Sequence, residues 1–279
     1  MSGSRALAFR ALVRACHPIP SAGVTAFVVV LAAAAGNASG RCAVIAAAIL
    51  CGQLSVGWSN DRHDVAADRM ARRREKPLAA QEVSLRVTEI AIACALLGTV
   101  GFSLALGWRA GLLHLAAVAI AWAYNFWLKG TWFSWLPYAI AFGSLPAVVS
   151  LALPGHPAPA AWPVVAAALL GVAANFTNAL PDLESDRITG FRGAPNRLGA
   201  RPSLAIGAML LVLATAVTAF GPPGPPRWFD WAGLVATCCL VAVAVPVLWR
   251  RAATRIPFYA LMAAVPIDLV MIGVGRHLH

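Results

Sequence analysis

The chain has 279 residues, of which 60% are hydrophobic and only 12% are charged, whereas soluble domains carry about 25% charged residues. This composition excludes a water-soluble globule. The net charge is +11, which in a soluble protein would favour a nucleic-acid partner. In so apolar a chain the positions of the basic residues matter more than their sum, and we expect no nucleic-acid partner.

Apolar stretches, each close to the roughly 20 residues that a membrane-spanning helix needs, follow one another along the chain. Long Ala, Leu and Val runs favour helices over the short alternating strands of a membrane β-barrel. We therefore expect an all-α membrane protein, a single polytopic domain over residues 1–279 with nine transmembrane helices around a central cavity. The nine stretches lie at about residues 20–37, 42–58, 90–107, 110–128, 132–153, 161–180, 203–221, 230–249 and 257–275.

The basic residues predict the orientation. If the N-terminus is cytoplasmic, only Arg41, Arg109, Arg227 and Arg276 fall outside, and the other 18 Lys and Arg residues fall inside. This asymmetry favours a cytoplasmic N-terminus and a multi-pass protein of the cell membrane. Residues 4–16 are expected to form a basic amphipathic helix on the inner leaflet. A signal peptide ending near Gly36 is the alternative for the first stretch.

The acidic residues are few and clustered. Nine of the eleven lie on the two expected cytoplasmic segments that follow the second and sixth spans. Each segment contains the pattern N-x3-D-x3-D, and the two copies are offset by 118 residues, which suggests a weak duplication of halves at about 15–130 and 131–250, followed by a ninth helix. The repeated residues are Asn60, Asp64 and Asp68 in the first copy and Asn178, Asp182 and Asp186 in the second.

On an α-helix a four-residue step returns almost to the same face, so each copy is expected to form one acidic stripe. Like charges aligned in this way repel one another, so we expect a bound cation to stabilise them. Carboxylate and amide oxygens suit Mg²⁺, with Asn60, Asp64, Asp68, Asp182 and Asp186 as ligands. Asp61 and Glu184 lie off the stripes, where they either support the ligands from behind or are solvated. A solvated loop balanced by arginines is the alternative for either segment.

Several motifs together resemble the UbiA superfamily of intramembrane prenyltransferases. The first acidic segment reads N-D-x-x-D-x-x-x-D from Asn60, and the second contains D-x-x-x-D from Asp182. Further matches are R-x-x-x-P from Arg14, D…KPL with Lys76 in place of the usual Arg, the pair Tyr124 and Lys129, and Asp186-Arg187 continuing to Arg197-Leu198-Gly199. Ala79-Ala80 replaces the Ser-Gly frequent after this motif, and Asn178 stands where some members have Tyr.

The resemblance implies Mg²⁺-dependent transfer of an isoprenyl group from a prenyl diphosphate to a small or lipid acceptor, usually aromatic, with membrane lipids around the enzyme. Asp64 and Asp182 are then the catalytic candidates. The residues expected to bind substrate are Arg14, Arg72, Tyr124, Lys129 and Asn178.

Two other functions stay open on the sequence. One is a divalent-ion-dependent transporter or lipid carrier, although transporters usually place ionisable residues near the bilayer midplane. The other is a superfamily member with a non-aromatic acceptor, such as a prenyl phosphate that attacks a sugar diphosphate. Asp268, inside the last stretch, is expected to have a structural role, and Pro181 is expected to kink the sixth span.

Overall fold

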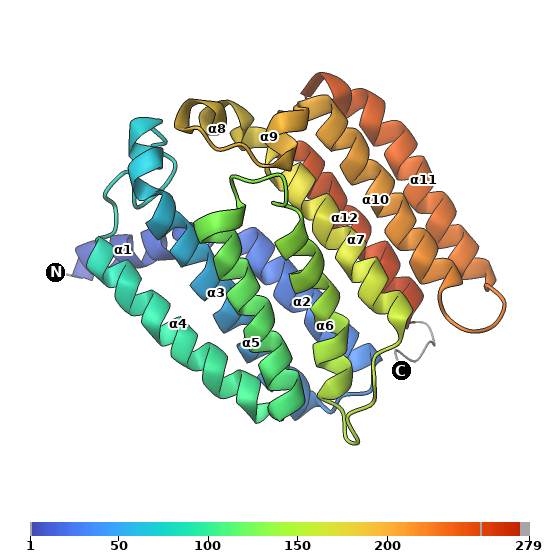
Figure 1. The fold of residues 1–279 in the computed structure, drawn as a ribbon. Helices are drawn as coiled ribbons and strands as arrows, with labels where there is room; N and C mark the ends of the chain where they lie inside the picture. Colours follow the sequence, from blue (N-terminus) through green and yellow to red (C-terminus); the bar gives the residue numbers. More distant parts are fainter. Residues whose placement is uncertain (1, 252, 274–279) are drawn as a thin grey trace.

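The computed structural model describes residues 2–251 and 253–273, and within these ranges all regular secondary structure is helical (Figure 1). The expected all-α class is therefore confirmed. The elements are α1 (Ser2–Ala15), α2 (Pro18–Ala34), α3 (Ser39–Met70), α4 (Leu85–Ala105), α5 (Trp108–Ala123), η1 (Tyr124–Leu128), α6 (Leu136–Leu151), α7 (Ala161–Asn178), η2 (Leu180–Asp182), α8 (Leu183–Thr189), α9 (Ala194–Leu198), α10 (Ala200–Phe220), α11 (Trp228–Leu248), η3 (Trp249–Arg251) and α12 (Ile256–Gly273).

Several of these helices can cross a membrane, so the chain is a multi-pass membrane protein. In the described part, six helical segments are long and apolar enough, and the bent pair α1 and α2 would make a seventh. The apolar helices α6 and α12 are shorter. The stretches expected from the sequence coincide with helices, and the total of nine spans stays a prediction because it includes these shorter ones.

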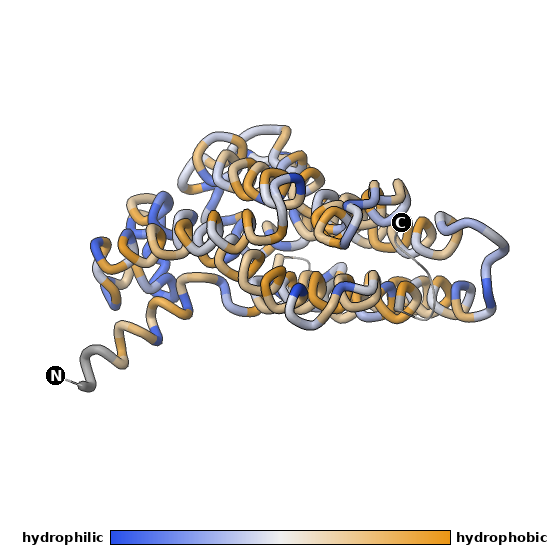
Figure 2. Tube along the Cα trace, turned by 90° about the horizontal axis from the view of Figure 1, so that it is seen from below, coloured by the Kyte–Doolittle hydropathy of each residue, from blue (hydrophilic) through white to orange (hydrophobic). Residues whose placement is uncertain are grey.

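The connections that carry the acidic motifs gather at one end of the bundle. In Figure 1 the segment after α3, the turn between η1 and α6, and the short helices α8 and α9 all lie along the upper side of the bundle. Apolar residues dominate along the long helices, and the hydrophilic ones concentrate near chain connections (Figure 2). The 32 residues of α3 extend roughly 48 Å, more than the roughly 30 Å of a hydrocarbon core. Its acidic C-terminal third can therefore stand beyond the lipid tails.

Small residues allow the helices to approach closely. A Cβ atom at Gly171 of α7 would lie 2.4 Å from the Tyr138 carbonyl oxygen of α6. The core between α2, α3 and α6 contains Val28, Ile45 and Val148, all fully buried. Apolar side chains on the outer faces, such as Val243 and Val247 of α11, are exposed, as lipid contact requires.

The N-terminal helix meets α2 at a sharp corner. The axes of residues 6–15 and of α2 differ by 64°, and His17 at the corner has a left-handed backbone with φ 53°. Pro18 begins α2, as proline does at the first helical position. The carbonyl of Cys16 comes so close to Gly57 of α3 that a Cβ there would lie 2.7 Å from it. The corner is thus packed directly against the helix that carries the first acidic motif.

The second acidic motif does not form the single stripe expected from its spacing. The helix α7 ends at Asn178, residues Leu180–Asp182 form a 3-10 turn, and α8 begins at Leu183. Proline has no N–H and its ring clashes with the preceding turn, so Pro181 interrupts the helix between Asn178 and Asp182. The kink expected at this proline is a complete break of the helix, and it redirects the residues that follow.

Candidate active site

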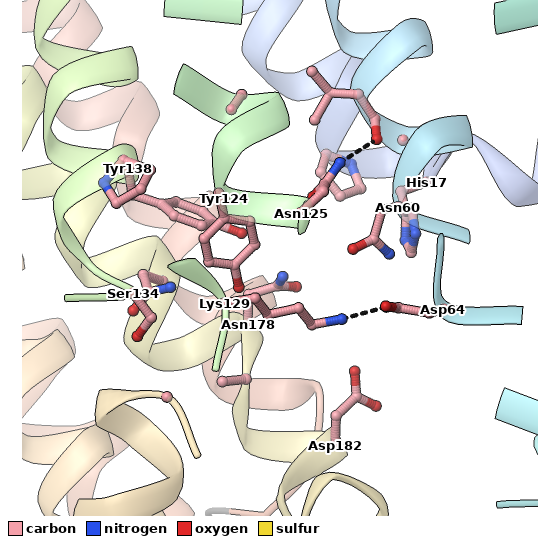
Figure 3. A pocket seen from close by; sticks show the side chains of 18 of the residues that line it. His17, Asn60, Asp64, Tyr124, Asn125, Lys129, Ser134, Tyr138, Asn178 and Asp182 are labelled. Carbon is pink, nitrogen blue, oxygen red and sulfur yellow. Dashed lines mark hydrogen bonds and ion pairs between the residues drawn. The ribbon is translucent and has the colours of Figure 1, made fainter. Parts of the chain in front are cut away.

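A cavity of about 230 Å³ opens among the segments that carry the two motifs. Both copies of the pattern contribute to its wall, together with residues of η1 and the loop after α3 (Figure 3). The expectation of a central cavity bounded by the motifs agrees with this geometry. The polar residues of the wall include His17, Gln53, Asn60, Asp64, Arg73, Lys76, Tyr124, Asn125, Lys129, Tyr138, Asn175, Asn178, Asp182, Asp186 and Asn196.

The first motif forms a continuous stripe on α3. Asn60 and Asp64 line the cavity, while Asp68, one turn further, is 5% exposed and lies outside its lining. The carboxylate of Asp64 accepts a hydrogen bond from Lys129 Nζ through Oδ2, as Figure 3 shows. Its other oxygen, Oδ1, is buried and has no hydrogen-bond partner among the described residues.

The second motif reaches the same cavity through Asn178, Asp182 and Asp186. Asp186 Oδ2 accepts a hydrogen bond of 3.0 Å from Asn196 Nδ2, so a residue ten positions downstream holds this carboxylate. The 3-10 turn at Pro181 and the short helix α8 thus direct two acidic side chains towards the face presented by α3.

Arg73 joins the two motifs. Its Nη2 donates to Asp182 Oδ1 at 2.6 Å, and its Nη1 lies 3.4 Å from Asp68 Oδ1. A third contact of 3.0 Å runs from Nε to Glu75. One guanidinium therefore spans carboxylates that are more than 100 positions apart in the chain.

The positive charges offset the repulsion between the carboxylates. Burial alone would lower the pKa of Arg73, but Asp182, Glu75 and Asp68 outweigh it, and the pKa lies above its ordinary value. Burial likewise acts to lower the pKa of Lys129, and Asp64 more than reverses this. Both side chains are therefore cations at neutral pH, and the cation that the aligned acids require is supplied in part by the protein itself.

The donor set fits a divalent ion of the magnesium type. Asn60, Asp64, Asp68, Asp182 and Asp186 offer only oxygen atoms, which Mg²⁺ prefers, and the unpartnered Oδ1 of Asp64 is a buried acceptor that lacks a donor. In the described ranges no three acidic, His or Cys side chains already form a compact metal-binding group. Lys129 and Arg73 lie between the carboxylates, which would have to exchange these partners for a metal.

A π-helical turn places the aromatic and basic residues of the cavity wall. The helix α5 widens into η1 over Tyr124–Leu128, a distortion that is frequent at functional sites. Asn125 anchors this turn on α3 by donating to the Val56 carbonyl and to Ser59 Oγ, at 3.0 and 2.9 Å. Tyr124 faces Tyr138 of α6 edge-on, with ring centroids 5.2 Å apart.

The aromatic residues at 122–142 divide between the cavity and the outer surface. Tyr124, Tyr138 and Phe142 line the cavity. Trp127, Trp132 and Phe133 are exposed on the outside, where aromatic residues favour membrane interfaces. One part of this aromatic cluster therefore lines the cavity, and the other part lies on the outer surface of the protein.

A second, apolar cavity of about 140 Å³ adjoins the first. The two share Pro20, Gln53, Tyr138, Phe142 and Asn178 as lining residues. The remaining wall of the second cavity is apolar and includes Phe27, Leu170 and Phe258. A molecule with a charged head and a hydrocarbon tail could thus place its two parts in adjacent chambers.

The structure brings most of the predicted site residues together, with two exceptions. Arg14 is exposed and pairs with Glu82 at 2.7 Å. Arg72 is exposed and has a left-handed backbone with φ 54°, and neither residue lines the cavity. The position expected for Arg72 is taken by its neighbour Arg73, because the loop reverses direction after α3.

Sequence reasoning missed several groups that the fold adds to the wall. Arg73, Asn125, Asn175 and Asn196 carried no individual signal, since each is a common residue type in a loop or an apolar helix. Lys76 and Asp61 form a buried ion pair of 2.6 Å, so Asp61 is not a solvated acid. Asp268 is 2% exposed and lies in α12, apart from the residues that line the polar cavity.

Comparisons with known proteins agree with this geometry. The sequence model described as the UbiA prenyltransferase family matches residues 22–265. No curated protein matches by sequence. Among solved structures, an apo UbiA homolog from Aeropyrum pernix K1 is similar with a TM-score of 0.73 and 20% identity, covering 90% of this chain and 96% of that one.

Two structures of a UbiA homolog from Archaeoglobus fulgidus are also similar. The one bound to GPP and Mg²⁺ has a TM-score of 0.68 and 16% identity, and covers 95% of this chain and 100% of that chain. The one bound to DMAPP and Mg²⁺ has a TM-score of 0.68 and 17% identity, with coverage of 95% and 99%. These neighbours share the fold across nearly the whole chain.

Proposed function

The chain belongs to the UbiA prenyltransferase family, and from this premise we propose that it transfers an isoprenyl group from a prenyl diphosphate to an aromatic acceptor within the membrane. One observation carries the proposal: carboxylates of both motifs, with Lys129 and Arg73, surround a polar cavity that adjoins an apolar one. Such a pair of chambers suits a substrate that is an anion at one end and a hydrocarbon at the other.

Binding of the diphosphate is assigned to the cations and to Mg²⁺. The homolog from Archaeoglobus fulgidus that was solved with GPP and Mg²⁺ supports this assignment. Asn60, Asp64, Asp68, Asp182 and Asp186 would hold the metal, which when bound stabilises the negative charge that develops on the departing diphosphate. Lys129 and Arg73 would exchange their carboxylate partners for phosphate oxygens, to which charge-assisted hydrogen bonds are strong.

The remaining residues of the wall would protect the reacting carbon. When the C–O bond to the diphosphate breaks, the allylic carbon becomes electron-poor. The faces of Tyr124 and Tyr138 can stabilise such a cation, and the apolar chamber with Phe27, Phe142 and Phe258 excludes the water that would hydrolyse it. Asn178, which lines both chambers, stands where head and tail would meet.

We further assign the protein to the cell membrane with the polar cavity open to the cytoplasm. The distribution of Lys and Arg supports this orientation, because the last turn of α3 and the loop after it contribute five basic residues, from Arg69 to Lys76, on the side of the cavity. A cytoplasmic opening would give Mg²⁺ and the diphosphate direct access from the aqueous phase.

The test is turnover by purified membranes that contain the protein. Labelled prenyl diphosphates of several lengths are incubated with phenolic, quinol-precursor and haem acceptors, with Mg²⁺ or with EDTA. We expect a prenylated product and released diphosphate that both require Mg²⁺. Ion flux without turnover would instead support a transporter.

Variants of the carboxylates sharpen this test. Asp64→Ala and Asp182→Ala should each lower turnover at least about 100-fold, since each removes an oxygen ligand and a partner of a cavity cation. The matched control is Glu184→Ala, because Glu184 is an exposed acid of the same segment whose recorded ion pair is with Arg187. Near-normal turnover of both aspartate variants would contradict the proposal.

A further inference from the structure

At the cavity wall and directly behind it lies a cluster of three charged or titratable side chains that the proposed function does not use. Asp61 Oδ1 accepts from Lys76 Nζ at 2.6 Å and lies 3.1 Å from His17 Nε2. Lys76 Nζ and His17 Nε2 are 3.4 Å apart. Asp61 is 1% and Lys76 8% exposed, whereas the side chain of His17 is 35% exposed.

The cluster presents two of its side chains to the cavity. His17 and Lys76 are both lining residues, and Figure 3 shows His17 beside Asn60 on the wall that also carries Asp64. Asp61 is buried behind them and does not line the cavity. The ring of His17 therefore connects a buried carboxylate to the space where substrates would meet.

The two nitrogens of the His17 ring have different surroundings. Nε2 lies 3.1 Å from Asp61 Oδ1 and 3.4 Å from Lys76 Nζ, whereas Nδ1 has no hydrogen-bond partner in the described part of the chain. A carboxylate that accepts from one ring nitrogen selects the tautomer in which the other nitrogen carries a lone pair. With its proton on Nε2, His17 can accept a proton at Nδ1 from a group in the cavity.

The backbone brings this ring into position. Cys16 and His17 connect α1 to α2, and the φ of 53° at His17 turns the chain through the corner between the two helices. The close approach of Cys16 to Gly57 fixes the same corner on α3. A left-handed conformation is costly for a residue with a Cβ, and a corner needed only as a turn would favour glycine.

We propose that His17 is the catalytic base that takes the proton of the acceptor, with Asp61 and Lys76 as positioning residues. This inference rests on the proposed function. In the step, the allylic C–O bond breaks and its electron pair leaves with the diphosphate, while the nucleophilic atom of the acceptor forms the new bond to carbon. The proton that this atom loses moves to His17 Nδ1.

The test uses removal of the ring and its chemical replacement. His17→Gly suits the left-handed backbone and leaves the space of the ring open. In purified membranes with geranyl diphosphate, Mg²⁺ and 4-hydroxybenzoate, or the panel acceptor that the wild type prenylates fastest, we expect kcat to fall at least about 100-fold. The KM for geranyl diphosphate should change little, and added imidazole should restore at least a tenth of the lost turnover.

The matched control is His156→Gly. His156 also has a left-handed backbone, with φ 51°, and lies in the turn between α6 and α7, away from the cavity. This variant should keep wild-type turnover and show no response to imidazole. Asp61→Asn should lower kcat without imidazole rescue, because it removes the group that orients the ring rather than the base.

The outcomes separate the two proposals. If the wild type prenylates no acceptor, the proposed function fails and the inference fails with it. If the wild type is active and His17→Gly keeps its kcat, or loses it in a folded protein without rescue by imidazole, His17 is not the base while prenyl transfer stands. Thermal unfolding of each variant in detergent identifies a loss that comes from misfolding.

Discussion

At the scale of single residues, the sequence predicts the chemistry of the cavity better than the identity of each side chain. Asp64, Asp182, Asp186 and Lys129 are found on the cavity wall, as the motifs predict, whereas Asp68 lies just outside the lining. Arg72 and Arg73 are adjacent in a run of arginines, and nothing in the sequence distinguishes them. The turn after α3, in which Arg72 adopts φ 54°, directs Arg73 inward, and this depends on local backbone geometry that spacing does not encode.

A pair of matched variants tests this assignment. Arg73→Gln should lower kcat/KM for a prenyl diphosphate about 100-fold, since the guanidinium that bridges Asp182 and Asp68 would bind and stabilise phosphate oxygens. Arg72→Gln, the same exchange on an exposed side chain, should stay within about threefold of wild type. Initial rates at varied donor concentration give the comparison, and equal effects in both variants would assign no special role to Arg73.

At the scale of elements, hydropathy predicted where helices lie but not how they bend. The continuous helix through Asn60 and Asp68 follows from its uninterrupted periodicity. Pro181 predicts a kink and the four-residue spacing predicts one stripe, but the proline ends the helix and separates Asn178 from the two aspartates. The π-helical turn over Tyr124–Leu128 carries no sequence signal, and the hydrogen bonds that anchor it through Asn125 reach residues of α3 that are far away in the chain.

Close packing of α6 on α7 yields a prediction of its own. Gly171→Ala would place a methyl group 2.4 Å from the Tyr138 carbonyl and 2.7 Å from Phe142 Cβ. Relief requires the two helices to separate, and overpacking of this kind costs about 1–3 kcal/mol. Thermal unfolding in detergent should show a lower Tm, and turnover should fall because Tyr138 and Phe142, which form the contact, line the cavity.

The control for this substitution is Gly101→Ala in α4. Nothing lies within 4 Å of a Cβ at Gly101, so the same exchange should leave the Tm unchanged or slightly raised, since alanine favours a helix over glycine. A Gly171→Ala protein as stable as this control would show that the two helices can adjust to the added methyl group.

At the scale of the whole molecule, composition alone excluded a soluble protein and predicted a helical membrane domain. Which helices touch could not be predicted, because the contacts between α6 and α7 or between α2 and α3 depend on small residues and shape rather than on hydropathy. The two acidic motifs meet at one end of the bundle because an even number of spans separates them. The sequence indicates this even number.

The proposed orientation can be measured by labelling. In a background without native cysteines, Pro223→Cys in the turn after α10 should react with a membrane-impermeant maleimide in intact cells. Ala80→Cys, in the exposed loop after α3, should react only after permeabilisation. Both positions are exposed, so access to reagent is limited by the bilayer alone. The reverse labelling pattern would show the opposite orientation, with the polar cavity open to the outside of the cell.

The contacts of Lys129 and Arg73 have a consequence for the order of events. Because these two side chains already act as counterions, the carboxylates are held in place before a metal binds. Arrival of the charged substrate would then proceed as an exchange of partners, in which each carboxylate gives up a side chain and gains a ligand. The two freed cations become available at the moment when a leaving group needs them.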